Sequence, residues 1–205
     1  MNKNQLTNFI TKYTLGGEIK STKWTSNGDS LSTRFISGDK SVVGKVVLSK
    51  FSHLSPCELG VYNTGQLSSL LSVLGDDIDI NLSQSGDKFI SMEFEDTKRK
   101  TKSKYMLSDL SVIPTPPALK NLPDSFELGI KVDPYFINTF TSGKSALAEA
   151  ETFTILTEGG KTKIVIGYAS IASNRVTIPV ETTKSAEIEP ISFNANMFAS
   201  ILNAN

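Results

Sequence analysis

Apolar residues follow a helix-capping residue at the same spacing in four places along the chain. An Asn or Asp is followed by apolar residues four and seven positions later, at Asn2, Asn63, Asp133 and Asn194. Such side chains accept hydrogen bonds from the free N–H groups of a first helical turn, and residues at +4 and +7 then share one face. The pattern predicts four short amphipathic helices that need another layer to pack against.

Alternating apolar and polar residues follow each of the first three predicted helices. Most of the turns between them contain the Asn-Gly, Gly-Asp or Gly-Gly pairs that are typical of β-hairpins. The expected strands are residues 18–26, 30–37 and 41–49, residues 77–84, 88–96 and 102–109, and residues 148–158, 161–170 and 175–181. The predicted repeating unit is a strand, a helix and three strands in an antiparallel meander.

The capping residues are separated by 61, 70 and 61 residues. Short, long and short intervals indicate two similar domains of two units each. Four prolines in Val112–Asp124 predict a stiff, extended connector within the long interval. We therefore expect an α+β fold with an N-terminal domain over residues 1–111, a connector over 112–124 and a C-terminal domain over 125–205. Because only 11 residues follow Asn194, the last unit lacks its three strands, and we expect the chain to be a fragment.

Composition excludes some classes of protein. The chain has 205 residues, of which 39% are hydrophobic and 20% charged, with zero net charge and one cysteine. No apolar run approaches the roughly 18 residues of a membrane span, and no signal-peptide core is present, so we expect no membrane partner. Cys57 alone cannot form an internal disulfide, which fits a reducing compartment. Zero net charge argues against a protein that coats nucleic acid with its whole surface, but it allows a protein with one basic face.

No set of residues predicts catalysis, a cofactor or a metal site. Thr141–Ser145 resembles the end of a phosphate-binding loop, but Asn138 stands where that motif needs glycine. A helix C-terminus closed by Lys144 is the favoured interpretation. The carboxylates of residues 76, 77 and 79 have no His or Cys nearby, and His53 and Cys57 have no activating neighbour. We expect a protein that is not an enzyme.

The run Thr97–Lys104 is the strongest local charge signal. A solvated hairpin is the simplest interpretation. The alternative is a patch that contacts phosphates without reading bases. The second predicted helix, in contrast, has a small, polar and uncharged outer face.

Two domains of paired strand–helix–three-strand units resemble the DNA polymerase sliding clamps of large tailed phages, within the PCNA-like clamp superfamily. Most of the resemblance lies in Val61–Pro114, where a strand, a turn and a Leu-rich helix end precede acidic residues, a strand and a Gly turn. ISFNANMFASILNAN is similar to the strand and helix that open the last unit of those clamps. The resemblance covers nearly the whole chain in layout.

The resemblance implies a homotrimeric ring that encircles duplex DNA without reading its sequence and acts in the cytoplasm of an infected bacterial host. It implies a tether for the replicative DNA polymerase, placed on DNA by an ATP-dependent clamp loader. The residues expected to face DNA are Lys3, Lys12, Lys98, Arg99, Lys100, Lys102 and Lys144.

Partners of such clamps bind through short peptide tails near the interdomain connector. By position this points to Leu110, Val112, Ile113 and Pro114, although the same residues would equally serve to hold the connector against the first domain. The alternative function is that of a β-rich phage structural or assembly protein that does not slide on DNA.

Overall fold

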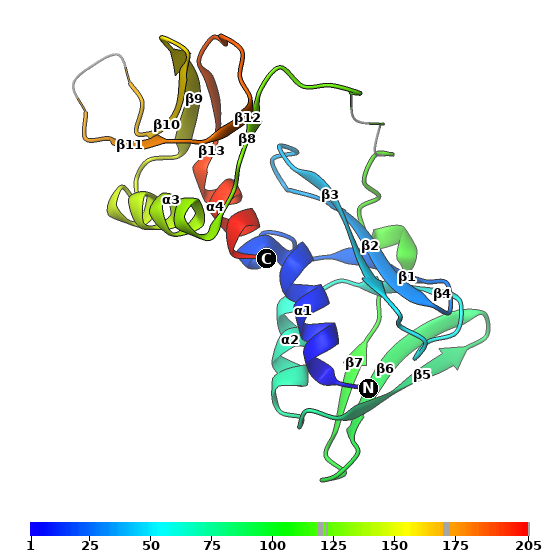
Figure 1. Cartoon of the computed structure of the whole chain (residues 1–205). Coiled ribbons are helices and arrows are strands. Elements are labelled where there is room, and N and C mark those ends of the chain that lie inside the picture. The colour runs from blue at the N-terminus through cyan, green and yellow to red at the C-terminus, as the bar shows by residue number, and fades with distance from the viewer. Residues whose placement is uncertain (119–120, 122, 170–172, 205) are drawn as a thin grey trace. The chain divides into compact units, whose positions relative to one another are not determined.

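The computed structural model describes residues 1–118, 121, 123–169 and 173–204. Within these ranges the fold is α+β, with four α-helices and thirteen strands in several antiparallel sheets. The chain divides into two compact units, Met1–Leu119 and Lys120–Asn203 (Figure 1).

Every α-helix begins directly after its predicted capping residue. The helices are α1 (Lys3–Thr14), α2 (Thr64–Ser72), α3 (Pro134–Ala146) and α4 (Ala195–Asn203). The side-chain oxygen of each cap accepts a hydrogen bond of 2.8–3.0 Å from a backbone N–H two or three residues later. The four predicted helix starts are confirmed. In the described part of the chain, none of these helices has the length and apolarity to cross a membrane.

The first unit contains two antiparallel meanders. One consists of β1 (Thr22–Ser26), β2 (Ser30–Ile36) and β3 (Val43–Ser49), and β4 (Cys57–Val61) extends it in the order β3-β2-β1-β4. The other is β5 (Ile78–Ser85), β6 (Lys88–Asp96) and β7 (Lys102–Met106), in chain order. Both meanders were predicted from the alternation of the sequence.

In this unit, the residues before each helix do not pair with the meander that follows that helix. They pair with the first strand of the meander that follows the other helix. β4 precedes α2 and pairs with β1, with Leu59 opposite Trp24. The residues before α1 pair with the start of β5, where Met1 N donates to Ile78 O at 2.6 Å and Ile78 N donates to Met1 O at 2.9 Å. This exchange of strands joins the two halves of the unit into one core.

The second unit repeats the arrangement of the four-stranded sheet of the first unit. Its strands are β8 (Gly129–Ile130), β9 (Thr152–Glu158), β10 (Lys161–Ile166), β11 (Val176–Pro179), β12 (Thr182–Lys184) and β13 (Ile191–Asn194). The order β11-β10-β9-β13 matches β3-β2-β1-β4, because β13 precedes α4 as β4 precedes α2. The short strand β8, before α3, pairs with β12 instead.

Several strands are shorter than predicted. The first starts at Thr22 rather than Glu18, because α1 continues into a 3-10 turn over Leu15–Gly17. β10 ends at Ile166, before Gly167 turns the chain with φ +77°. Ser170, the predicted end of that strand, lies outside the described residues.

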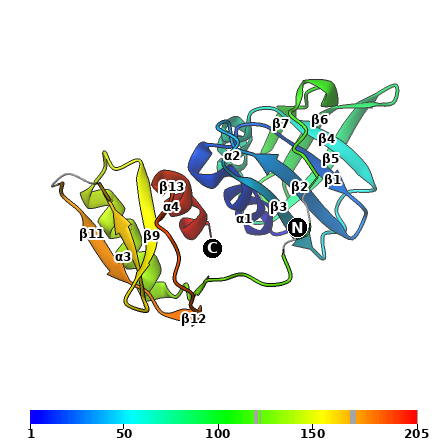
Figure 2. The same cartoon turned by 90° about the horizontal axis from the view of Figure 1, so that it is seen from above.

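In each unit two helices lie side by side and cover the sheets from one side (Figures 1 and 2). In the first unit, Phe9, Tyr13 and Trp24 form an edge-to-face aromatic cluster. Trp24 Nε1 donates to Tyr13 Oη at 3.2 Å, and the Tyr13 hydroxyl donates to Thr64 Oγ1 at 3.3 Å, which links β1 to both helices. The second unit has a cluster made of Phe136, Phe140, Phe153 and Phe198.

The predicted connector begins against the first unit. A 3-10 turn spans Leu110–Val112, and Ile113 is buried. Lys23 Nζ donates to Thr115 Oγ1 and Arg34 donates to the Pro116 carbonyl, both at 3.0 Å. The connector residues Leu119, Lys120 and Leu122 lie outside the described residues.

Candidate functional site

The four helices contain none of the 21 acidic residues of the chain. Glu is a good helix former and is common on solvent-facing helix surfaces. Its absence from all four helices confines negative charge to strands, turns, loops and the Asp133 cap. A polyanion that approaches these helix surfaces therefore meets no carboxylate from the helices themselves.

The outer faces of α1 and α2 are polar and almost uncharged. Their exposed residues are Asn4, Gln5, Thr7, Asn8, Thr11 and Lys12 in α1, and Gly65, Gln66, Ser69, Ser72 in α2. On α3 the exposed positions include Asn138, Ser142 and Ser145, together with Tyr135, which is 77% exposed. These faces offer hydrogen-bonding groups but few fixed charges.

Three of the predicted DNA-facing cations lie on helices, and they differ in how exposed their charged groups are and in whether those groups already bind carbonyls. Lys12 is exposed in the last turn of α1. Lys3 is half-buried, and its Nζ donates to the Leu74 carbonyl at 2.5 Å, just beyond the end of α2. Lys144 is only 8% exposed and donates to the carbonyls of Leu147 and Ala148, the latter at 2.7 Å. Lys144 therefore closes the end of α3, and its buried side chain is not part of the candidate interface.

The other predicted cations lie on the hairpin between β6 and β7. Lys98 pairs with Asp77 at 3.1 Å, and Glu95 pairs with both Lys100 at 3.4 Å and Lys102 at 3.1 Å. Lys104 pairs with Glu93 at 2.9 Å. The lysine side chains remain more than half exposed, and exposed pairs of this kind are weak. Phosphates can compete for these lysines, but the neighbouring carboxylates reduce the local positive charge.

A buried carboxylate fixes the base of this hairpin. Asp96 accepts backbone hydrogen bonds of 2.8 Å from Gly75, Lys98 and Arg99. The hydrogen bond from Arg99, followed by those from Lys98 and Gly75, lowers the pKa of Asp96 despite its burial. The hairpin is therefore attached to the segment that follows α2.

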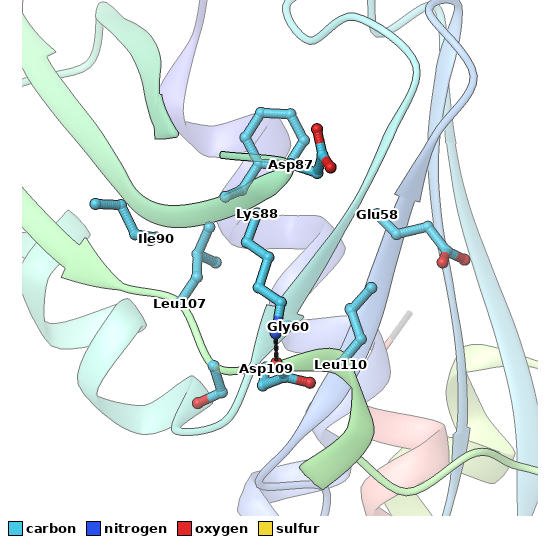
Figure 3. Close-up of a pocket in the computed structure, with 10 residues that line it drawn as sticks. Glu58, Gly60, Asp87, Lys88, Ile90, Leu107, Asp109 and Leu110 are labelled. Atoms are coloured by element: carbon cyan, nitrogen blue, oxygen red, sulfur yellow. Dashed lines mark hydrogen bonds and ion pairs between the residues drawn. The ribbon is translucent and has the colours of Figure 1, made fainter. Parts of the chain in front are cut away.

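A pocket of about 430 Å³ lies elsewhere in the first unit, between β4, the β5–β6 hairpin and the segment after β7 (Figure 3). Its apolar lining comes from Phe89, Ile90, Leu107 and Leu110. The carboxylates of Glu58, Asp87 and Asp109 also line it. The volume falls within the range of ordinary ligand pockets.

Two contacts shape this pocket. Lys88 reaches Asp109 at 2.5 Å, as the dashed line in Figure 3 shows. That contact, with hydrogen bonds from Ser111, holds the pKa of Asp109 well below its usual range. Ser108 N donates to Gly60 O at 3.0 Å, and a β-carbon on residue 60 would overlap the Ser108 carbonyl. Glycine at this position lets the segment after β7 lie directly on β4.

The four predicted partner-binding residues do not form one surface. Leu110 lines the pocket, whereas Ile113 is 3% exposed and lies beside Gly60 in the core. Val112 is 58% exposed and Pro114 is also exposed. The other pocket residues come from three separate segments of the chain and were not among the residues predicted from the sequence.

The other residues considered as functional candidates in the sequence lie in surroundings that indicate a structural role. Thr141–Ser145 lies within α3 rather than in a strand-to-helix loop. Within the described residues, no three His, Cys, Asp or Glu side chains are placed to hold a metal ion. His53 lies against the ring of Phe51, and partial burial raises the pKa of the Cys57 thiol.

No protein-family model and no curated protein matches this chain in sequence.

Proposed function

We propose that this chain is a subunit of a DNA sliding clamp, which encircles duplex DNA and tethers a replicative DNA polymerase. The internal repeat supports this proposal. In both units a helix precedes an antiparallel meander. A later strand pairs with the first strand of that meander, and a second helix follows this later strand. A ring assembled from such units would present several equivalent helix pairs to the DNA.

The acid-free helix faces are the observation that carries the proposal. Duplex DNA has a high density of negative charge, so acidic side chains facing it would be repelled. A clamp must also move along DNA, which excludes dense or base-specific contacts. Asn, Gln, Ser and Thr side chains can contact phosphates through water and release them readily.

The cations of the proposed interface are Lys12, the exposed lysine of α1, and secondarily the β6–β7 hairpin. Lys3 and Lys144 instead bind carbonyls near helix ends. Few cations suffice in this proposal, because a closed ring is retained on DNA by topology rather than affinity. Closure requires association of subunits, proposed here as a homotrimer, and an ATP-dependent loader to open the ring.

The test is retention on DNA with and without free ends. The protein is loaded by a polymerase-associated clamp loader and ATP onto a nicked circular plasmid, and bound protein is measured before and after a restriction enzyme cuts the circle. We expect retention on the circle and release after cutting. With a primed circular template and the cognate polymerase, the products should lengthen.

Equal retention on circular and linear DNA would indicate an ordinary DNA-binding protein. No retention on either, with no change in product length, would contradict the clamp proposal. It would then favour the alternative of a β-rich phage structural or assembly protein.

A further inference from the structure

Three cations lie in one row across the first sheet. β1, β2 and β3 are neighbours there (Figure 1), and their register places Arg34 between Lys23 on one side and Lys45 on the other. Adjacent strands are about 5 Å apart, and residues directly opposite each other point to the same face. Because Trp24 and Thr33 are buried on the helix side, alternation places these three cations, the basic row, on the outer face.

No carboxylate neutralises the basic row. β1, β2 and β3 contain neither Asp nor Glu. In the part of the chain that the structure describes, no ion pair of 4.0 Å or less includes any cation of the row. Glu58 of β4 lies on the same face, opposite Thr25, and it is not paired with the row either. Three cations and one carboxylate leave this face with two uncompensated positive charges.

The hydrogen bonds of the basic row leave its charge in place. Lys23 donates to the Thr115 hydroxyl, and Arg34 donates to the carbonyls of residues 116 and 117. These oxygens satisfy donors but carry no net charge. Lys45 is exposed on β3, at the edge of the sheet. Since like charges directly opposite each other destabilise a sheet, the row lowers the stability of the protein when no anion is bound.

The corresponding sheet of the second unit has no such row. Lys163 of β10, the strand that corresponds to β2, lies between Leu156 and Pro179. It also forms an ion pair with Glu158. The repeated fold therefore does not require a row of unneutralised cations, and the row is a property of the first unit's own sequence.

From this arrangement we infer that the basic row binds the backbone phosphates of single-stranded DNA on the outer face of the first sheet. Arg and Lys contact phosphates without reading bases. A single strand can bend to place consecutive phosphates on adjacent cations, whereas the phosphates of a duplex are held on a stiff helix. The aromatic residues of β1 and β2, Trp24 and Phe35, are buried, so bases find no stacking platform there. Binding is therefore weak and independent of base sequence.

This site lies on the face of the sheet opposite the helices, whose outer surfaces carry the clamp proposal. Binding of a single strand to the outer face requires neither a closed ring nor a loader. Single-strand binding and retention on a circular duplex can therefore be measured separately.

The experiment uses the full chain and a fluorescein-labelled oligothymidylate of about 15 nucleotides, a length within the usual range of single-strand sites. Fluorescence anisotropy measures affinity at several salt concentrations. Each cation that contacts a phosphate contributes about −0.7 to the slope of log affinity against log salt concentration, so the row should contribute about −2. Amide chemical-shift changes should be largest in β1, β2 and β3.

The decisive variant replaces the whole basic row, as Lys23→Gln/Arg34→Gln/Lys45→Gln. Its slope should be less steep by about 2, and its affinity at low salt should fall at least about tenfold. The matched control removes two lysines and one arginine at exposed positions of the second unit and should keep the original slope; it is Lys161→Gln/Arg175→Gln/Lys184→Gln.

A single variant tests the row without touching the connector. Lys45→Gln removes the exposed cation at the sheet edge and should make the slope less steep by about 0.7. Its melting temperature should be kept or raised, because repulsion from Arg34 is relieved.

Equal slopes in the two triple variants would overturn the inference, as would chemical-shift changes confined to the helices. Tighter binding of a fluorescein-labelled oligoglutamate of the same length would also overturn it, since the row would then serve an acidic protein segment. Loss of retention on the circular plasmid with intact oligothymidylate binding would count only against the clamp proposal. The reverse result would count only against this inference.

Discussion

The carboxylate of Asp96 occupies the space that a β-carbon on residue 75 would need. Gly75 N donates to Asp96 Oδ2 at 2.8 Å, while Oδ1 accepts from the backbones of Lys98 and Arg99. One buried side chain thus connects the segment after α2 to the hairpin between β6 and β7. The φ angle of Gly75 is not positive, so the requirement for glycine here is steric.

Gly75→Ala should therefore destabilise the first unit. The new methyl group would push the Asp96 carboxylate from its three backbone donors, and we expect a loss of about 1–3 kcal/mol, measured by urea unfolding. Gly38→Ala is the matched control, because a β-carbon added at that position would meet no atom within 4 Å and its φ is not positive. An equal loss in both variants would contradict this account.

Stability should depend on pH through Asp96 and Glu95. The pKa of Glu95 is lowered chiefly by its contact with Lys102, and that of Asp96 by backbone hydrogen bonds. Their stabilisation is complete above the unfolded carboxyl pKa of about 4 and is lost as pH falls through the lower folded values. Asp96→Asn should be less stable than the wild type at neutral pH, with the gap narrowing below about pH 4. A gap that does not change with pH would contradict the assignment.

Adding acid to the helix faces should weaken DNA binding without unfolding the protein. Gln5 and Gln66 are exposed in the first turns of α1 and α2, where a carboxylate favours the helix. In Gln5→Glu and Gln66→Glu we expect the melting temperature to be kept or raised. DNA affinity should fall about threefold for each added acid at low salt and recover as salt screens the charge. Gln84→Glu, on exposed β5, is the isosteric control and should leave DNA affinity unchanged.

Lys12 and Lys144 should give opposite results when each is changed to Met. Lys144→Met loses two carbonyl contacts at the end of α3, and the free energy of unfolding should fall by about 2 kcal/mol. DNA affinity of the folded variant should not change. Lys12→Met removes an exposed charge, so it should weaken DNA binding and leave stability as it was. Hydrogen exchange in α3 and fluorescence anisotropy with duplex DNA measure the two effects.

Replacement of Lys98, Arg99 and Lys100 by Gln should weaken DNA association and reduce its dependence on salt. The fall in DNA affinity should be smaller than the loss of three unpaired cations would cause, because Lys98 and Lys100 form ion pairs with Asp77 and Glu95. The measurement is the slope of log affinity against log salt concentration. An unchanged slope would show that the hairpin is a solvated loop.

Much of the fold could be predicted from the sequence. Asn2 and Asp133 lie 131 residues apart, as do Asn63 and Asn194, and all four cap helices. Capping depends on groups within three residues of each other, and strand alternation is equally local. Strand ends were less predictable, because they depend on turns such as Gly167 whose backbone angles the periodic pattern does not reveal.

The burial of Lys144 could also have been inferred. It lies eleven positions after its cap, as Tyr13 does after Asn2, and position +11 shares the face of +4 and +7. Its charge suggested a solvent-exposed position, but its position relative to the cap puts its side chain on the buried face of the helix.

The sequence by itself determined the helix starts, the order of the meanders and the absence of acid from the helices, because these follow from short-range patterns. The duplication was also visible in the sequence, because the same short-range pattern recurs at regular intervals. Only the tertiary structure decided which cations are free and where the pocket lies. Glu58, Lys88 and Asp109 are far apart in the chain, and their proximity depends on packing of β4 against the segment after β7. Contacts of this kind arise from the folding of distant segments, for which no local spacing provides a signal.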